Sequence, residues 1–269
     1  MAKTVKKLSA MTTVNAVNDN QKIPLTDANG KVTLISLADL KKSLLGGMNL
    51  DQMNDNVFIM YHQKSNDFPY AVRPRKWKSL ENAGEIAEGV VIIDGGHVLV
   101  VAPTESESAL PWSSAGISCG ATTTSDRLVA FQDWNGKQNT AAIIKASKPD
   151  AITNTIQYAP GFCNLYSRTN ANGKGLTAGR WWLPSVAELM LMYAHQDKIN
   201  YALSLIKGAK PISESWYWAS TELSASNAWR LLFGSGIVNG WGAKVTDRNM
   251  VRPVSAFLAK TETQMAFPF

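Results

Sequence analysis

The chain has 269 residues, of which 45% are hydrophobic and 18% are charged. This length and composition indicate one large or two small globular domains. Lys and Arg outnumber Asp and Glu by 27 to 21, a net charge of +6, but the basic residues never form a block, so nucleic-acid binding is not expected. No stretch approaches the ~18 uninterrupted apolar residues of a membrane helix, so we expect no membrane insertion.

Export signals and cysteine or histidine sites are not apparent. The N-terminus has lysines but no continuous apolar stretch after them, so synthesis in a cytoplasm is expected. Two cysteines, Cys119 and Cys163, are too few for a disulfide framework and are predicted to be buried as small hydrophobic side chains. The three histidines, His62, His97 and His195, lack the spacing of a zinc site.

The N-terminal part begins with a polar segment and a predicted hairpin. Residues 1 to about 20 are rich in Lys, Thr and Asn, and the period of their apolar residues fits neither helix nor strand. This segment is either a solvated tail or an arm that becomes ordered against a partner. Two short apolar runs around an Asp-Ala-Asn-Gly turn predict a hairpin over residues 23–34.

A short helix and a linker complete this part. The spacing of Ser36 and Asp39 is like that of a capping box, and it predicts an amphipathic helix that ends at Gly46-Gly47. A polar linker follows over residues 49–56. About 50 residues of this kind cannot bury a sufficient core. We therefore interpret residues 1–56 as an attachment or oligomerisation module, held by a partner or by copies of itself.

From Val57 the sequence is rich in Trp, Gly and β-forming residues. Residues 89–102 consist of two Val- and Ile-rich runs around Asp94-Gly95-Gly96, which predicts a hairpin covered on both faces. Four helices are predicted beside the sheet: residues 139–145, capped by Asn139 or Thr140, residues 161–167, residues 186–195 and residues 198–207. The third has the clearest start, because Ser185 and Glu188 are spaced as a capping box.

The remaining sequence is predicted to form strands. Trp216-Tyr217-Trp218 alternates like a half-buried strand. In the next strand, one face has Trp229, Leu231 and Phe233, and the other has Ala228, Arg230 and Leu232. A last strand is predicted from Met250 to Leu258, and residues 259–269 form a polar tail.

Several motifs in this region carry a resemblance to a known family. They are Gly-Arg-Trp-Trp-Leu-Pro-Ser-Val-Ala-Glu-Leu at 179–189, Tyr-Trp-Ala-Ser-Thr-Glu at 217–222, Asn-Ala-Trp at 227–229, and Val-Arg-Pro-Val at 251–254 with Phe257. Asp-Trp-Asn-Gly-Lys at 133–137 and the Asp94-Gly95 hairpin also match. This set resembles a C-type-lectin-fold family that includes bacterial surface lectin-like domains and the variable proteins of diversity-generating retroelements. The family is related in fold to the formylglycine-generating oxygenases, and the resemblance covers residues 85 to 258.

The resemblance implies an α+β, C-type-lectin-like domain over residues 57–258, a mixed, mainly antiparallel sheet with packed helices. In such proteins the Trp-Leu-Pro-Ser helix packs on the sheet. Ala219 stands where Ser is commoner, a change that we expect to be tolerated. Glu222 and Arg252 are expected to have a structural role, for which an ion pair between them is one arrangement, and a contact with ligand is the alternative. The tryptophans at strand spacing are expected in the core: Trp181, Trp182, Trp216 and Trp218.

The segment from Leu223 to Asn249 is where the resemblance places exposed ligand-binding side chains. Its glycines alternate with unlike residues, a mixture typical of an antibody-like recognition surface. An ordinary irregular loop is the alternative. The candidate ligand-binding residues are Arg230, Leu231, Ile237, Trp241, Ala243, Val245, Thr246, Asp247 and Arg248.

The sequence does not favour catalysis or a metal. No histidine has a partner in a recurring catalytic spacing, and the two cysteines precede the final sheet, whereas the oxygenase relatives use a late cysteine pair. A calcium cage needs clustered carboxylates, and the terminal segment offers Asp247 with scattered Asn. We therefore expect a protein that is not an enzyme and has no cofactor or metal.

The leading hypothesis is a phage virion fibre protein of the head or the tail, made in the host cytoplasm. Residues 1–56 would bind other virion proteins and form a homotrimer, and the lectin-like domain would bind a host-surface glycan or protein. The first alternative is a bacterial variable adhesin or ligand-binding protein. The second is an oxygenase of the formylglycine-generating type.

Overall fold

The computed structural model describes residues 22–26, 30–36, 56–147 and 154–257. Contacts divide the chain into two compact units, residues 1–54 with 268–269, and residues 55–267. The predicted N-terminal tail, the predicted helix after Ser36 and the predicted C-terminal tail lie outside the described residues.

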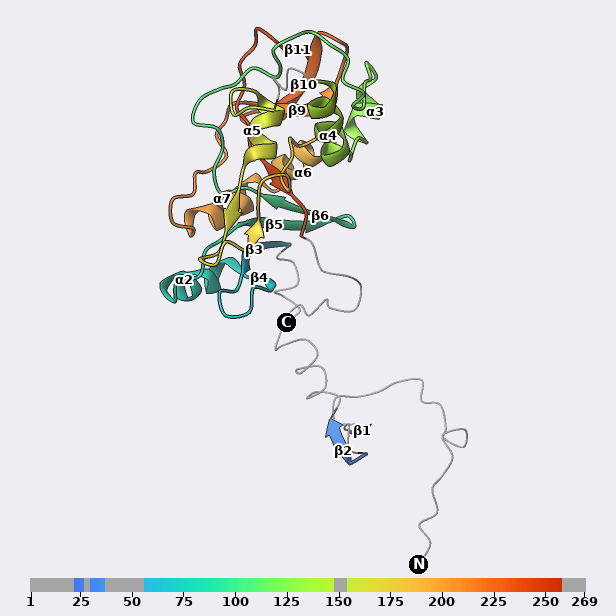
Figure 1. Ribbon diagram of the computed structural model, residues 1–269. Helices are drawn as coiled ribbons and strands as arrows, with labels where there is room; N and C mark the ends of the chain where they lie inside the picture. Colours follow the sequence, from blue (N-terminus) through green and yellow to red (C-terminus); the bar gives the residue numbers. More distant parts are fainter. Residues whose placement is uncertain (1–21, 27–29, 37–55, 148–153, 258–269) are drawn as a thin grey trace, which may run out of the picture. The chain divides into compact units, whose positions relative to one another are not determined.

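The described part of the first unit is an antiparallel hairpin (Figure 1). Strand β1 (Lys22–Thr26) pairs with β2 (Val32–Ser36), which confirms the hairpin predicted over residues 23–34. Val32 and Leu34 are 61% and 60% exposed. The hairpin therefore leaves apolar side chains in contact with solvent.

The second unit contains a five-stranded sheet with the order β12-β6-β5-β3-β4, in which every neighbouring pair is antiparallel. Its strands are β3 (Val57–His62), β4 (Pro69–Val72), β5 (Gly89–Asp94), β6 (His97–Val101) and β12 (Val254–Ser255). The pair β5–β6 confirms the predicted Asp-Gly-Gly hairpin. Val90 and Ile92 belong to one buried cluster, and Val91 and Val100 to another, so both faces are covered as predicted.

Two helices cover one face of this sheet. Trp77 of α2 (Pro74–Asn82) and Ile199 of α7 (Gln196–Ser204) share a buried cluster with Ile59 of β3. The other face packs against Trp181 and Leu176 of β8 (Gly175–Leu176), which pairs with β7 (Arg168–Thr169).

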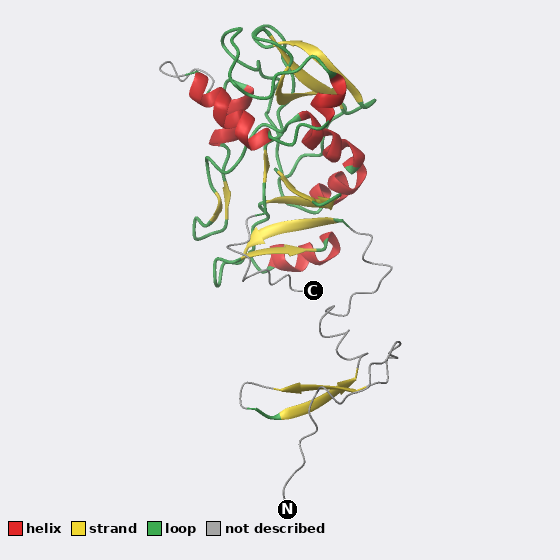
Figure 2. Ribbon diagram, turned by 90° about the vertical axis from the view of Figure 1, so that its right-hand side faces the viewer, coloured by secondary structure: helices red, strands yellow, loops and turns green. Residues whose placement is uncertain are grey.

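A three-stranded antiparallel sheet has the order β11-β10-β9, formed by β11 (Ile237–Ala243), β10 (Asn227–Leu232) and β9 (Trp216–Glu222). One face packs on α6 (Val186–Ala194) in the same cluster as the helices of the first sheet, and the other places Trp218 against Trp112 and Val251. Figure 2 shows the helices of this unit packed beside its strands. The fold is therefore α+β with mainly antiparallel sheets.

The predicted helices near residues 139–145 and 161–167 are present, but the first begins earlier than predicted. Helix α4 (Gly136–Ala146) has Asn135 at its N-cap, and α5 spans Ala159–Leu165; α3 (Arg127–Phe131) was not predicted. Asn139 and Thr140 do not cap α4, because their side chains bind other segments. Asn139 accepts a hydrogen bond from the Thr122 amide at 2.8 Å, and Thr140 accepts one from the Leu183 amide at 3.0 Å.

The last strand is much shorter than the predicted Met250 to Leu258. Within the described residues, which end at Phe257, only Val254–Ser255 pairs as β12, since Pro253 has no N–H for a ladder and the preceding residues bond to separate segments. The Met250 amide bonds to Trp216 O at 2.8 Å, and the Val251 amide to Ser106 Oγ at 3.1 Å.

The predicted start of α6 is confirmed. Ser185 is its N-cap, and the Glu188 carboxylate accepts hydrogen bonds from the Ser185 amide at 2.9 Å and from Trp182 Nε1 at 3.1 Å. Glu188 is almost completely buried, and this burial raises its pKa to about 7.

Candidate ligand-binding surface

Strand β11 lies at the edge of the three-stranded sheet and contains a β-bulge. Ala228 of β10 pairs with Gly242, and Arg230 pairs with Asn239. Two residues of β11, Gly240 and Trp241, therefore lie opposite a single residue of β10, Trp229. A bulge of this kind redirects a side chain and interrupts the regular alternation of faces.

The two glycines beside Trp241 are required by close packing. A Cβ atom at Gly240 would lie 2.4 Å from Leu223 Cδ1, and one at Gly242 would lie 2.3 Å from Trp218 Cζ3. The backbone of β11 thus lies directly on the core at these positions. Trp241, between them, is 70% exposed and points away from it.

Two asparagine side chains hold the backbone of Trp241. Asn239 Oδ1 accepts a hydrogen bond from the Trp241 amide at 2.7 Å, and Asn227 Nδ2 donates one to the Trp241 carbonyl at 3.3 Å. These bonds give the Trp241 amide and carbonyl hydrogen-bond partners within the chain. The exposed indole is therefore presented from a fixed backbone.

The turn that follows β11 is stabilised by hydrogen bonds between its charged side chains, Asp247 and Arg248, and its backbone. Arg248 Nη1 donates to the Val245 carbonyl at 2.9 Å. Asp247 accepts a hydrogen bond from the Ala243 amide at 3.1 Å and forms an ion pair with Arg230 at 3.0 Å. Arg248 is exposed, whereas Asp247 is half-buried.

Arg230 connects this turn to the sheet. Its guanidinium carbon lies 4.7 Å from the centroid of the Trp216 ring, a cation–π contact, while it pairs with Asp247. Trp216 is half-buried, so the prediction that it lies in the core is wrong. Trp216 is the first residue of β9, and its ring contacts the guanidinium of Arg230, which pairs with Asp247.

The nine predicted site residues have three kinds of environment. Ile237, Trp241, Val245, Thr246 and Arg248 are exposed, and Arg230, Ala243 and Asp247 are half-buried. Leu231 is only 1% exposed, so its prediction as a ligand contact is wrong. It shares the face of β10 with Trp229, and that face packs on α6. The candidate surface consists of the other eight residues.

A buried ion pair lies under this surface and was not predicted. Lys244 Nζ is 3.3 Å from Glu222 Oε2, donates to the Ile117 carbonyl at 2.9 Å and lies 4.4 Å from the centroid of the Trp112 ring. Both charged side chains are fully buried, and desolvation lowers the pKa of Lys244. Lys244 therefore ties the start of the turn to the segment around Ile117.

The predicted pair between Glu222 and Arg252 is wrong. Arg252 pairs with Glu105 at 2.8 Å and donates to the carbonyls of Ala102 and Pro211 at 3.0 and 2.9 Å. Glu222 pairs with Lys244 and accepts a hydrogen bond from the Cys119 amide at 3.0 Å. Both residues are structural, as expected, but each is neutralised by a residue from a different segment.

Residues that the sequence analysis missed include Asn227 and Asn239. Asn227 belongs to the Asn-Ala-Trp motif at 227–229. Nothing in that motif indicates that its side chain would bond to the carbonyl of Trp241, 14 positions later. The Gly-Trp-Gly sequence at 240–242 is the one local signal, since glycine in a strand often marks a bulge or a close backbone approach.

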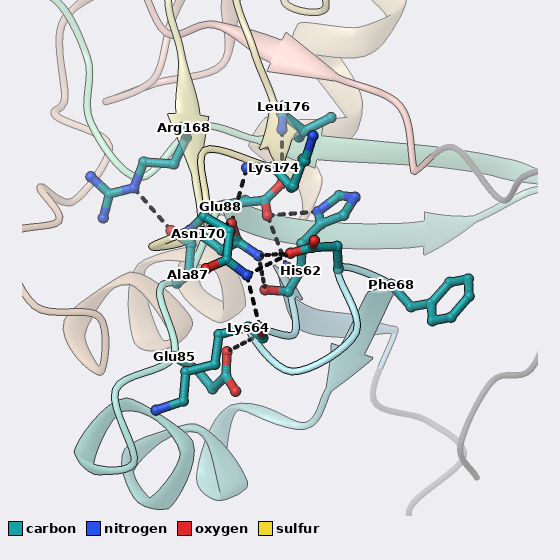
Figure 3. Close-up of polar contacts among 12 residues, drawn as sticks. His62, Lys64, Phe68, Glu85, Ala87, Glu88, Arg168, Asn170, Lys174 and Leu176 are labelled. Carbon is teal, nitrogen blue, oxygen red and sulfur yellow. Dashed lines mark hydrogen bonds and ion pairs between the residues drawn. The ribbon is translucent and has the colours of Figure 1, made fainter.

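A second group of polar side chains joins the β3–β4 connection to the loop between β7 and β8 (Figure 3). The buried Glu88 carboxylate is 2.6 Å from His62 Nδ1 and accepts from the Leu176 amide at 3.0 Å. Asp67 has a positive φ of 57° and accepts hydrogen bonds from Asn170 and Asn172 at 2.8 and 3.0 Å. These bonds lower the pKa of Asp67.

This polar group connects loops, and its side chains are hydrogen-bonded to one another. Within the described residues, no hydroxyl or thiol is hydrogen-bonded to the His62 side chain. The arrangement has a carboxylate that orients a histidine but lacks the nucleophile of a catalytic triad. We assign it a structural role.

In the part of the chain that the structure describes, no three His, Cys, Asp or Glu side chains are placed to hold a metal ion. The helices described there are too short or too polar to cross a membrane. Cys119 and Cys163 are both free and buried, as predicted.

Comparisons with known proteins give little information. No protein-family model matches the sequence, and no curated protein matches it. Among solved structures, the crystal structure of a fimbrial protein from Bacteroides ovatus is similar over 60% of this chain, with 18% sequence identity and a TM-score of 0.40. The match spans 36% of that protein's length.

Proposed function

We propose that this chain is a phage virion fibre protein that binds a ligand on the host surface through the candidate surface on β11. Carbohydrate is the ligand class that we favour. The observation that carries the proposal is Trp241, a largely exposed indole on a bulged edge strand whose amide and carbonyl are both held by asparagine side chains. Rigid exposed aromatic residues of this kind act as anchors in binding surfaces.

The domain that presents this surface is proposed to have the C-type-lectin-like fold. Three of the motifs that resemble this family, at 179–189, 217–222 and 251–254, are hydrogen-bonded to one another around the start of α6, which supports this proposal. The Ser220 amide donates to Pro184 O at 2.7 Å, and Thr221 Oγ1 accepts from the Val186 amide at 3.1 Å. Trp182 and Val254 exchange two backbone hydrogen bonds at 2.9 and 3.0 Å.

The hairpin of residues 22–36 is proposed to belong to a homotrimeric attachment module that binds other virion proteins. An isolated two-stranded hairpin is marginally stable in water, and Val32 and Leu34 are exposed on this one. Copies of the hairpin packed together would cover these side chains. Three linked binding domains would also gain ~10²–10⁴ in avidity over one.

Binding to bacterial cells tests the role of Trp241. Labelled full-length protein is incubated with a panel of strains and with polysaccharides purified from the strains that it binds. We expect Trp241→Ala to lose at least ~30-fold in affinity, as substitution of a binding anchor does. Phe68→Ala is the matched control, because Phe68 is also an exposed aromatic residue but lies on the β3–β4 connection (Figure 3). Wild-type binding by Trp241→Ala, or an equal loss in Phe68→Ala, would contradict the proposed surface.

Light scattering of the full-length protein tests the attachment module. We expect a trimer, and we expect the double variant Val32→Ser, Leu34→Ser to shift toward monomer. A wild-type monomer would contradict oligomerisation through the hairpin.

A further inference from the structure

The loop of residues 113–118 lies beside the end of β11 and is held there by Lys244, the residue that follows this strand. The Trp112 and Ser113 amides donate to the Lys244 carbonyl at 2.9 and 3.1 Å. At the other end of the loop, Lys244 Nζ donates to the Ile117 carbonyl at 2.9 Å. The backbone and the side chain of one residue therefore fix both ends of the loop.

The same loop reaches the residues that hold Trp241. A Cβ atom at Gly116 would lie 3.6 Å from Ser226 Cα, an ordinary packing distance, so the loop packs on the turn between β9 and β10. The Ser226 carbonyl accepts from the Lys244 amide at 3.0 Å. The next residue, Asn227, is the one whose side chain donates to the Trp241 carbonyl. Figure 1 shows the segment before α3, in green, at the same end of this unit as β11.

Exposed apolar side chains lie on both the loop and β11 with its turn. Trp241 is 70% exposed, Val245 is 40% exposed, and Ile117 on the loop is 38% exposed. Single exposed apolar residues are ordinary, but these three belong to segments that are hydrogen-bonded to one another through Lys244. Ile117 was not a predicted site residue, because it lies outside the segment 223–249.

These segments carry few charges, although 18% of the chain is charged. Residues 108–125 contain no Asp, Glu, Lys, Arg or His, and residues 223–243 contain one, Arg230. Arg230 is paired with Asp247 at 3.0 Å, and Lys244 belongs to the buried ion pair described above. An ionised ligand group would lose water here without gaining a free counter-charge from these segments, which is unfavourable.

Uncharged polar groups are available instead. Within the described residues, neither Asn239 Nδ2 nor Trp241 Nε1 donates a hydrogen bond, so both can donate to hydroxyl groups of a ligand. Arg248 is the exposed cation of the neighbouring turn, and its Nη1 donates to the carbonyls of residues 245–247. An exposed aromatic face with neutral donors beside it suits the C–H and O–H groups of an uncharged sugar.

We propose that the loop of residues 113–118 is a second part of the ligand-binding surface, with Ile117 as its contact residue, and that the ligand is an uncharged sugar. Trp241 stacks on the C–H face of the ring, and Ile117 packs against an aliphatic part of the same ligand. This inference rests on the function proposed for β11, for which it names the ligand class and a further contact segment.

The ligand class is tested with polysaccharide extracted from a bacterial strain that the full-length protein binds. Anion-exchange chromatography separates the extract into an uncharged and an acidic fraction, and the protein is titrated with each. We expect the uncharged fraction to bind, with an affinity that changes less than ~3-fold between roughly 50 and 500 mM salt, because no ion pair is screened. Binding confined to the acidic fraction, or a loss of ~10-fold or more at high salt, would overturn the proposed ligand class.

Two variants test the loop. Ile117→Ser should weaken binding of the uncharged fraction by ~10-fold, and Ala115→Arg, which adds bulk at an exposed position, should also weaken it. Val98→Ser is the matched control, because Val98 is also an exposed aliphatic residue, 43% exposed, but lies on β6. Melting temperatures of all variants show whether a loss of binding is a loss of folding.

The outcomes separate this inference from the function on which it rests. If Trp241→Ala loses binding while Ile117→Ser and Ala115→Arg both bind like wild type, the loop is not part of the surface, and the proposed function stands. An equal loss in Val98→Ser and Ile117→Ser would also refute the loop contact. If wild type binds no strain, or Trp241→Ala binds like wild type, the function proposed for β11 fails, and this inference fails with it.

Discussion

The buried carboxyl of Glu188 makes the stability of the fold depend on pH. Burial raises the pKa of Glu188 to about 7 from an ordinary value of 4.5, although its hydrogen bonds from Ser185 and Trp182 oppose the shift. In the unfolded chain the carboxyl ionises near its ordinary value, whereas the folded protein keeps the proton to about pH 7. The free energy of unfolding should therefore fall as the pH rises through this window, by about 3 kcal/mol.

Glu188→Gln should remove this contribution. The glutamine side chain is close in size, stays neutral at every pH, and its oxygen can accept the bonds from the Ser185 amide and Trp182 Nε1. Urea unfolding of wild type and variant should be compared from about pH 4 to about pH 8. We expect the difference between the two proteins to change by about 3 kcal/mol across this range, in favour of the variant at high pH.

The difference in free energy of unfolding between wild type and Glu188→Gln is compared at each pH. The other titratable groups are present in both proteins, so their contributions cancel in this difference. Glu214→Gln, at an exposed carboxylate, is the matched control and should show no such change. If the difference between wild type and Glu188→Gln stays within about 0.5 kcal/mol across the whole range, the buried carboxyl does not behave as argued.

Three further substitutions test the packing under the β11 surface. Trp218→Ala should lose roughly 3–5 kcal/mol in urea unfolding, while Trp241→Ala should stay within about 0.5 kcal/mol of wild type; equal losses would show that Trp241 belongs to the core. Gly242→Ala should cost about 1–3 kcal/mol, because the new methyl group overlaps the Trp218 ring, and an unchanged melting temperature would refute this close approach. Lys244→Met should cost about 3–5 kcal/mol by leaving Glu222 unpaired, and adding Glu222→Gln should restore much of that loss; a larger loss in the double variant would contradict the pairing.

The elements that were predicted correctly depend on local signals. The hairpin around Asp94 follows from its turn residues, and the start of α6 follows from a cap that spans three residues. The burial of Leu231 was also visible in its spacing with Trp229, and placing it on the binding surface ignored that alternation. Local sequence was therefore sufficient where a short segment determines its own conformation.

The elements that were missed depend on contacts between distant segments. Arg252 meets Glu105 across 147 positions, and nothing near either residue specifies that partner in preference to Glu222. The bulge at Trp241 depends on the register between β10 and β11, which is set by packing of Gly240 and Gly242 on the core. The exposure of Trp241 was predicted, because glycines flank it in the sequence, whereas the bulge and the asparagine side chains that hold its backbone were not.

The bulge in β11 has a consequence for proteins that are crowded together in an assembly. A regular edge strand offers a row of free amides and carbonyls to which a strand of another molecule can add. In β11 the Trp241 amide and carbonyl are already bonded within the chain, and the indole projects from the same position. Neighbouring copies therefore meet an interrupted edge at this point, so the feature that presents the side chain also disfavours sheet-to-sheet aggregation.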